Sequence, residues 1–371
     1  MRQNMWKITI PLTLVFWGMA NTVHADFSEI LEKTFRDAGL IAIACGVSDD
    51  VQTLEIAAFG MREINNTIPV STADKWHLGS ISKSLTTMLL GTYVAEGRLD
   101  LDANLPGLLP HLAADMHDDW RQTSLRDVLE HRAGLPVNFG FTTMRMVEID
   151  TQNRRSARAK ALRAVLSKPA KSREFRYSNI GYTLAGHVAE TLGDQAWETQ
   201  MRARIFIPMG LKTAGFGAPK GEGRYDQPVG HANFLGVFRK PMNPFDSPAD
   251  NTPIIGPAGT VHMSIDDLLA YGRRLLVMSN GQDALLPAAV FSDITTPNHG
   301  QYAGGFIQAQ ADWAGGEYFW HNGSNTMWYA LLVILPQKNR VIAITTNQIT
   351  TKTPKLIWDT MVEIAAKTSM N

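Results

Sequence analysis

The strand-forming segments lie near the two ends of this chain, and this placement constrains the fold more than any other feature of the sequence. Each segment is rich in apolar and β-branched residues. The four segments are 41–47, 53–59, 328–335 and 341–346. Within each pair the connection has turn composition, Ser48-Asp49-Asp50 in the first and Pro336-Gln337-Lys338-Asn339 in the second. We therefore predict a β-hairpin at each end of the chain.

Helical patterns fill the long middle and flank the hairpins. Apolar residues at helical spacing predict a helix over 27–38 and a closing helix that begins at Thr353-Pro354 and covers one face of a sheet. The expected fold is α/β (α+β), with an antiparallel sheet flanked by helices, formed from both chain ends and carrying an inserted all-helical domain. We place the sheet-plus-helix domain at 26–95 and 255–371, and the insertion at 96–254. Residues 215–256 are rich in Gly, Pro, Asn and Asp, which predicts a long ordered loop.

Residues 1–25 have the pattern of a signal peptide. Arg2 and Lys7 precede an apolar run that is shorter than the roughly 20 residues a bilayer-spanning helix needs. Val23-His24-Ala25 supplies the small residues of a cleavage site, so we predict cleavage after Ala25. The alternative is an uncleaved anchor. A cleaved chain is expected to be secreted, into a bacterial periplasm, without a stable membrane anchor.

Charge and cysteine content exclude several classes of protein. The 35 basic residues balance the 35 acidic ones and form no local cluster, which argues against a nucleic-acid partner. The single cysteine, Cys45, allows no intrachain disulfide and is expected to be buried on a strand; a catalytic role would need a base, and none lies nearby in sequence. The ten histidines show no His-Glu-x-x-His or clustered spacing, so neither a metal nor a cofactor is expected. The oligomeric state stays open.

Ser80 and Lys83 could form an activated nucleophile. Ser80 opens an apolar helical pattern that runs to Gly97, and Lys83 follows one turn later on the same face. A hydroxyl beside a desolvated amine at a helix start has the parts of a nucleophile and its base. Ser80 could equally be a helix N-cap, and about one Ser-x-x-Lys match is expected by chance in a chain of this composition.

Two further short motifs carry polar groups at helix and strand boundaries. Tyr177 and Asn179 precede an amphipathic helix and project to the same side of an extended loop. His321, Gly323 and Ser324 border the carboxyl-terminal hairpin, where the glycine would let a ligand approach the backbone. Taken singly, each could be structural.

The ordered motifs Ser80-x-x-Lys83, Tyr177-x-Asn179 and His321-x-Gly323 resemble the class C-like branch of the serine β-lactamase and penicillin-binding-protein superfamily. This branch includes β-lactamases, D,D-carboxypeptidases, D-aminopeptidases and esterases. The resemblance extends to most of the chain after the leader. It includes 127–136 (Leu-Leu-x-His-x-Ser-Gly-Leu-Pro in the branch), 205–211 (Phe-x-Pro-Leu-Gly-Met) and 257–264 (Pro-Ala-Gly-Gly-Leu-x-Ser-Thr).

The resemblance implies a β-lactamase/transpeptidase-like fold with the active site in a cleft. It implies that Ser80 is the acylated nucleophile and that Lys83 and Tyr177 pass its proton to the leaving group. Asn179 would orient the substrate, and the backbone N–H groups of Ser80 and Ser324 would form an oxyanion hole. Which of Lys83 and Tyr177 is the base stays open.

His321 departs from the lysine that begins this motif in dedicated β-lactamases and D,D-peptidases. A neutral imidazole attracts a substrate carboxylate less than a fixed ammonium does. We therefore expect a serine hydrolase that acts on an ester or small peptide amide, with a small molecule or short peptide as its partner. The alternatives are a β-lactamase or D,D-carboxypeptidase, and a non-catalytic penicillin-binding sensor or scaffold that is acylated once and stalls.

Overall fold

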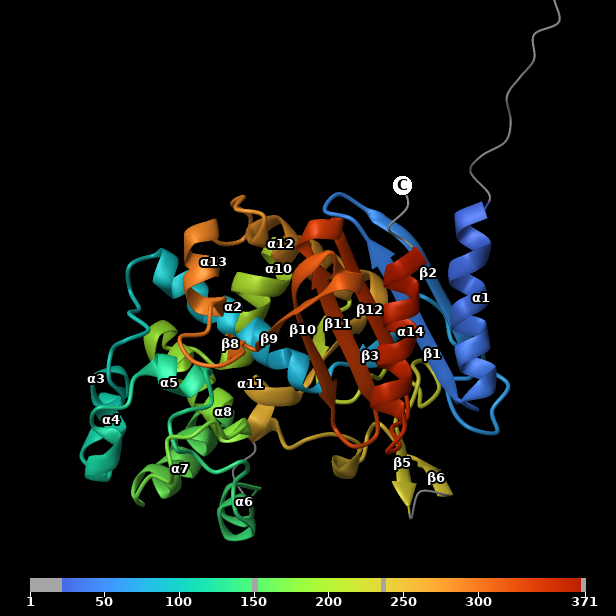
Figure 1. Ribbon diagram of the computed structural model, residues 1–371. Helices are drawn as coiled ribbons and strands as arrows, with labels where there is room; N and C mark the ends of the chain where they lie inside the picture. Colours follow the sequence, from blue (N-terminus) through green and yellow to red (C-terminus); the bar gives the residue numbers. More distant parts are fainter. Residues whose placement is uncertain (1–21, 149–152, 235–237, 368–371) are drawn as a thin grey trace, which may run out of the picture.

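A seven-stranded antiparallel sheet joins the two ends of the chain. The computed structural model describes residues 22–148, 153–234 and 238–367. The strand order is β2-β1-β12-β11-β10-β9-β8 (Figure 1). These strands are β1 (Ala42–Ser48), β2 (Thr53–Gly60), β8 (Tyr302–Ala303), β9 (Phe306–Ala311), β10 (Gly316–Ser324), β11 (Tyr329–Leu335) and β12 (Arg340–Thr346). Because β1 pairs with β12, with Cys45 opposite Ile344, the two predicted hairpins lie side by side in one sheet.

Helices cover both faces of this sheet. The terminal helices α1 (Thr22–Asp37) and α14 (Thr353–Lys367) pack together on one face, and α12 (Ile265–Ser279) packs on the other. Along β11, Leu331 and Val333 face the terminal helices, whereas Leu332 faces the side of α12. Burial on both faces explains why these strands are continuous apolar runs rather than alternating patterns. Cys45 is fully buried on β1, as expected.

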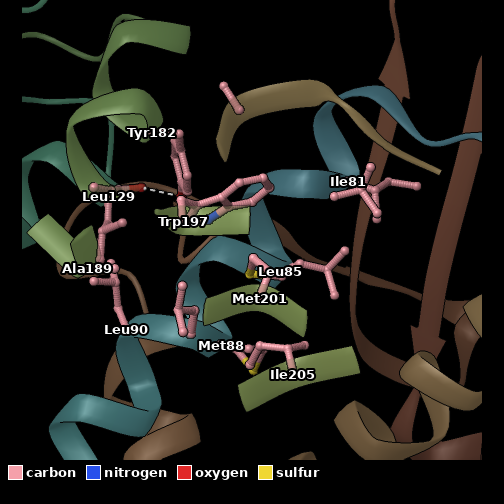
Figure 2. Close-up of a cluster of buried hydrophobic side chains, with 14 of the residues drawn as sticks. Ile81, Leu85, Met88, Leu90, Leu129, Tyr182, Ala189, Trp197, Met201 and Ile205 are labelled. Carbon is pink, nitrogen blue, oxygen red and sulfur yellow. Dashed lines mark hydrogen bonds between the residues drawn. The ribbon is translucent and has the colours of Figure 1, made fainter. Parts of the chain in front are cut away.

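The helical middle of the chain lies beside the sheet and surrounds α2 (Ser82–Ala95) (Figure 1). The other helices are α3 (Leu105–Leu108), α4 (Pro110–Ala113), α5 (Leu125–Leu129), α6 (Phe141–Glu148), α7 (Arg154–Leu166), α8 (Asn179–Gly193), α9 (Trp197–Met201), α10 (Ile207–Met209), α11 (Gly256–Gly259) and α13 (Ala288–Thr295). Figure 2 shows Leu85, Met88 and Leu90 of α2 among side chains of α8 and α9. α2 is buried at every position from 82 to 91, so it is the central helix of this region although its first two turns carry several polar residues.

The segment 215–254, which the expected boundaries place in the insertion, contains short strands as well as loops. The predicted loop 215–256 contains β4 (Gly215–Phe216) and the hairpin β5 (His231–Phe234) and β6 (Phe238–Pro241). β4 joins β3 (Lys75–His77) and β7 (Val261–Ser264) in a second sheet, in the order β3-β7-β4. These strands have two to four residues each, too short for a periodic apolar pattern. The domain boundaries stay predictions.

The predicted leader falls mostly outside the described residues, since residues 1–21 are not among them. The first helix begins at Thr22, five residues before the predicted start, and so includes the predicted cleavage site. Over the described part of the chain, no helix combines the length and apolarity that crossing a membrane requires.

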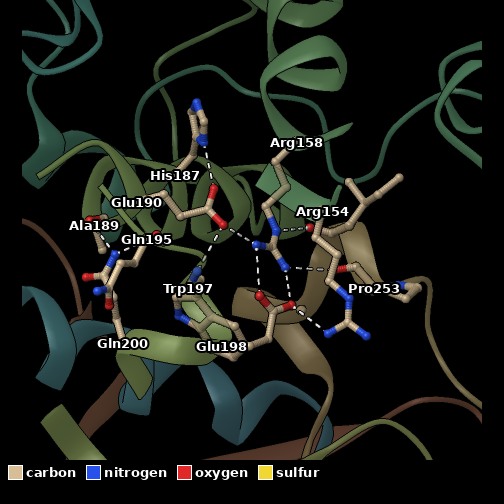
Figure 3. Close-up of polar contacts among 12 residues, drawn as sticks. Arg154, Arg158, His187, Ala189, Glu190, Gln195, Trp197, Glu198, Gln200 and Pro253 are labelled. Atoms are coloured by element: carbon tan, nitrogen blue, oxygen red, sulfur yellow. Dashed lines mark hydrogen bonds and ion pairs between the residues drawn. The ribbon is translucent and has the colours of Figure 1, made fainter. Parts of the chain in front are cut away.

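A buried charge cluster joins the helices that surround α2 (Figure 3). Arg158 of α7 is 0% exposed and forms ion pairs with Glu190 of α8 and with Glu198 of α9. It also donates to the carbonyls of Pro253 at 2.9 Å and Ile254 at 3.0 Å, just before α11. A buried guanidinium needs such complete pairing, because an unpaired buried charge is strongly unfavourable. Arg158 thereby connects three helices to the segment that carries α11.

Replacing Arg158 with Met should destabilise the protein strongly, because Glu190 and Glu198 lose their shared cation inside the helical region. Breaking a buried pair from one side typically costs about 3–5 kcal/mol. Arg155→Met is the matched control on the same helix, since Arg155 pairs with Asp194, which is 89% exposed. The control should change stability by at most about 1 kcal/mol. Denaturant unfolding of both variants measures the difference, and equal midpoints would contradict the structural role given to Arg158.

Candidate active site

Ser80 lies in a 3-10 turn, Gly79–Ile81, between β3 and α2. Hydrogen bonds between the Gly79 backbone and two neighbouring side chains hold this turn. The Gly79 N–H donates to Nδ1 of His77 at 3.1 Å, and the Gly79 carbonyl accepts from Oγ of Ser82 at 2.7 Å. Neither the turn nor α2 has a side-chain N-cap, so the Ser80 hydroxyl does not serve as one. Ser80 is only half-buried, which leaves it accessible to a substrate.

The amine of Lys83 contacts three oxygen atoms from three separate segments. Its Nζ lies 2.9 Å from Oγ of Ser80, 2.7 Å from Oδ1 of Asn179 and 2.8 Å from the carbonyl oxygen of Ala258. Ser80 precedes α2, Asn179 begins α8, and Ala258 belongs to α11. The structure therefore brings the predicted residues Ser80, Lys83 and Asn179 into direct contact.

The surroundings of Lys83 favour a neutral amine that faces Ser80. Lys83 is fully buried, and this burial lowers its pKa well below the ordinary value. The oxygens of Asn179 and Ala258 can only accept hydrogen bonds, so they take the two N–H bonds of a neutral amine. The remaining lone pair then faces the Ser80 hydroxyl at 2.9 Å. The site can thus accept a proton from Ser80.

Tyr177 contacts both Ser80 and Lys83. Its phenol is hydrogen-bonded to the Ser80 side chain, and its ring centre is 4.7 Å from Nζ of Lys83. Burial raises the pKa of Tyr177, against the smaller opposing effect of the Ser80 hydrogen bond. A raised pKa keeps the phenol protonated at neutral pH, so Tyr177 is arranged as a proton donor. Tyr177 and Asn179 both reach the same lysine, as expected from an extended loop.

Gly323 and Ser324 meet the nucleophile turn through backbone contact. A Cβ added at Gly79 would lie 2.2 Å from the Ser324 nitrogen, and one added at Gly323 would lie 2.5 Å from the Ser80 nitrogen. Both positions therefore require glycine. Ser80 and Ser324, whose backbone N–H groups the resemblance to the superfamily assigns to an oxyanion hole, thus lie on two segments in direct backbone contact.

His321 is neutral, and both of its ring nitrogens are engaged. Nδ1 contacts the Asn322 carbonyl, which can only accept, so Nδ1 carries the proton. Nε2 then accepts from the hydroxyl of Tyr302 at 3.1 Å. Burial lowers the pKa of His321 to about 3, with Lys83 acting in the same direction and the Asn322 carbonyl opposing. His321 therefore supplies no positive charge to the site at neutral pH.

Several residues that support the site were not singled out from the sequence. Ala258 was part of a quoted segment without a role, and only the chain path shows that its carbonyl meets Lys83. Asn138 accepts from Nδ2 of Asn179 at 2.7 Å at an exposed position. The Asp250 carboxylate lies 2.6 Å from Nε2 of His77, behind the nucleophile turn. The sequence carries no local signal for these pairings, because each joins segments more than 40 residues apart.

Two of the hollows in the described part of the molecule differ in their relation to the site. One, of about 460 Å³, is lined by residues that include Tyr177, Tyr302 and His321, and so adjoins the Ser80 site. A larger hollow of about 810 Å³ lies between α12, α13 and the strands β9 and β10, and none of the predicted site residues lines it. No group of three or more potential metal ligands occurs among the described residues.

Comparisons with known proteins agree with this arrangement. A beta-lactamase family model matches residues 27–366. Penicillin-binding protein 4 of Amycolatopsis lactamdurans is 25% identical over 334 residues, which cover 87% of this chain and 85% of that protein.

Two solved structures share the fold. D-amino acid amidase from Ochrobactrum anthropi SV3 superposes with a TM-score of 0.74 at 17% identity, covering 94% of this chain and 99% of that one. A D-stereospecific amidohydrolase from Streptomyces sp. superposes with a TM-score of 0.69 at 22% identity, covering 90% and 97%. The family match spans nearly the whole described region and includes all the site residues. The chain belongs to the beta-lactamase family of serine hydrolases.

Proposed function

We propose that this protein is an exported hydrolase that uses Ser80 as a nucleophile to cleave an ester or a small peptide amide through an acyl-enzyme. The observation that carries the proposal is the buried amine of Lys83, which is held by two acceptors and aimed at the Ser80 hydroxyl at 2.9 Å. A nucleophile and base at hydrogen-bond distance, with the base oriented by other groups, is the arrangement that activates a serine. Export rests on the leader pattern of residues 1–25.

In the acylation step, the Ser80 oxygen attacks the substrate carbonyl carbon while its proton passes to the amine of Lys83. The negative charge that develops on the carbonyl oxygen is stabilised by the backbone N–H groups of Ser80 and Ser324. When the intermediate collapses, the bond to the leaving alcohol or amine breaks, and the leaving group takes a proton from the phenol of Tyr177. The proton held by Lys83 then passes to the Tyr177 phenolate, directly or through a water molecule, and restores the phenol. Hydrolysis of the acyl-enzyme by water regenerates Ser80.

The opposite pKa shifts of the two residues support this division of roles. A lowered lysine pKa makes the amine available as a base, and a raised tyrosine pKa makes the phenol a poor base and a retained acid. We therefore assign the base to Lys83 and the acid to Tyr177. The D-amino acid amidase and the D-stereospecific amidohydrolase that share this fold support an amide substrate.

Penicillin turnover is a second candidate function, and the likeness to penicillin-binding protein 4 favours it. The neutral state of His321 weighs against efficient turnover, because the site lacks the fixed cation that a lysine would provide at that position. A sensor that is acylated once and stalls is the third possibility.

Ser80→Ala should abolish covalent labelling by a fluorophosphonate, because the acylated oxygen is removed. Stability should change by only about 1 kcal/mol, the size of one lost hydrogen bond. Intact-mass spectrometry before and after labelling measures the effect. Ser84→Ala is the control on the same face of α2, since the Ser84 hydroxyl bonds to the Ile81 carbonyl and should leave labelling intact. Labelling that persists in Ser80→Ala would remove Ser80 as the nucleophile.

Lys83→Ala should lower the acylation rate at least about 100-fold, which is typical of the loss of a general base. In the native protein, acylation should rise with pH as Lys83 loses its proton, with a midpoint well below the 10.5 of an ordinary lysine. Lys83→Arg should not restore activity, because a guanidinium stays protonated. Stopped-flow measurement of the acylation rate from about pH 4 to about pH 9 tests both the loss of rate in Lys83→Ala and the pH dependence of the native protein. Lys212→Ala, at an exposed lysine, is the control and should leave the acylation rate and its pH profile unchanged. An unchanged pH profile in Lys83→Ala would exclude Lys83 as the base.

Short-chain p-nitrophenyl esters should be turned over with a higher kcat/KM than the β-lactam nitrocefin. The reason is that the neutral His321 cannot attract the carboxylate of a β-lactam as a lysine at that position would. Steady-state kinetics on both substrates measures the ratio, and mass spectrometry shows whether nitrocefin leaves a lasting adduct. Comparable turnover would favour the β-lactamase alternative, and an adduct without repeated turnover of any substrate would favour the sensor.

A further inference from the structure

The hollow of about 460 Å³ beside Ser80 is bounded by two distant parts of the chain. Arg132, Phe175 and Tyr177 come from the helical middle, and His321 and Asn322 come from β10. The segment 299–302 closes a further side. Because Tyr177 hydrogen-bonds to Ser80, a substrate whose carbonyl lies at Ser80 can extend into this hollow. The hollow is therefore placed where the side chain or the leaving group of such a substrate could lie.

Arg132 is the residue in this lining that carries a permanent positive charge. Its Nε atom is buried and has no hydrogen-bond partner among the described residues. Its Nη2 lies near Gly300 on the facing segment, since a Cβ added there would be 3.7 Å away. The guanidinium therefore lies beside the segment 299–302 in the lining of the hollow. No Asp or Glu occurs among the described lining residues.

The neighbouring acids have other partners. Glu130 accepts the Asn298 N–H at 2.9 Å, and Asp127 accepts from the Ser124 hydroxyl at 2.8 Å in a helix cap. The buried Nε–H of Arg132 has lost water without gaining a partner, which leaves the guanidinium incompletely compensated. An anion in the hollow would compensate the charge through the other N–H groups of the guanidinium. Aromatic walls from Phe175, Tyr177 and Tyr302 lower the local dielectric, which strengthens a charge interaction there.

We propose that Arg132 is a specificity-determining residue that binds a carboxylate of the substrate in this hollow. The inference rests on the proposed hydrolase function and adds its substrate class, an ester or amide with a second, anionic group. The guanidinium presents N–H donors in a planar fork that matches a carboxylate. Arg132 comes from the helical wall of the hollow and His321 from β10, so the Arg132 charge would meet a different part of the substrate from a lysine at position 321.

Matched pairs of ester substrates test the proposal on both sides of the scissile bond. The acyl-side pair is mono-p-nitrophenyl glutarate against p-nitrophenyl valerate, which replaces the carboxylate with a methyl group. The leaving-group pair is para-carboxyphenyl butyrate against para-carbamoylphenyl butyrate. For each pair, the measured quantity is the ratio of kcat/KM for the anionic ester to that for the neutral ester. The native protein should favour the anionic ester in one pair, and high salt should weaken this preference.

Arg132→Gln should reduce that ratio about tenfold or more, as expected for the loss of a charge-assisted hydrogen bond. Arg132→Lys keeps the charge without the planar fork and should restore part of the ratio. Arg176→Gln is the matched control, because Arg176 is exposed on the adjoining segment and does not line the hollow. The control should keep both the ratio and the rates of the native protein.

The outcomes separate this proposal from the proposed function. If the native protein is labelled at Ser80 and turns over neutral esters, but Arg132→Gln leaves the ratio unchanged in both pairs, the role of Arg132 is wrong and the hydrolase stands. If the native protein shows neither labelling nor ester turnover, the proposed function fails first. A ratio that falls equally in Arg176→Gln would attribute the preference to general surface charge, and would overturn the specific role of Arg132.

Discussion

Desolvation of the Lys83 amine is the physical constraint on which the rest of the site depends. A lysine deprived of water has a lowered pKa and needs fixed acceptors for the N–H bonds that remain. Here the acceptors come from α8 and α11, so two helices far apart in sequence must meet at the start of α2. The charge cluster around Arg158 bonds to the two residues at 253–254 and thereby supports the segment that leads into α11. The helical region is therefore part of the catalytic arrangement as well as a wall of the cleft.

Much of the fold could be predicted because the decisive patterns are local. The apolar runs around Cys45 and Leu332 identify strands, and the helical spacing after Ser80 identifies α2. The short strands β3, β4 and β7 could not be predicted in the same way, because two to four residues carry no periodicity. Their pairing is decided by neighbours that are distant in sequence.

The sequence also allowed the reacting residues to be predicted, but not their protonation states. The resemblance of the ordered motifs to the superfamily implied that Ser80, Lys83 and Tyr177 act together, but a motif does not contain the burial that moves the two pKa values in opposite directions. The same holds for His321, whose neutrality follows from Tyr302 and from its own neighbouring carbonyl. Arg132 was passed over because it occupies a variable position of a quoted segment, and only the folded chain places it beside an aromatic hollow.

The contact between Gly79 and Gly323 limits how this site can change in evolution. At each glycine, backbone atoms of the other segment occupy the space that a Cβ would need. A side chain at either position would therefore separate the nucleophile turn from β10. The width of the slot that receives the reacting carbonyl is therefore fixed by main-chain atoms. New substrate preferences would have to arise from the surrounding walls, at lining positions such as Gln301 that do not contact this pair of glycines. Substitutions that change substrate preference are therefore expected in the lining of the hollow, and not at the backbone contact between Gly79 and Gly323.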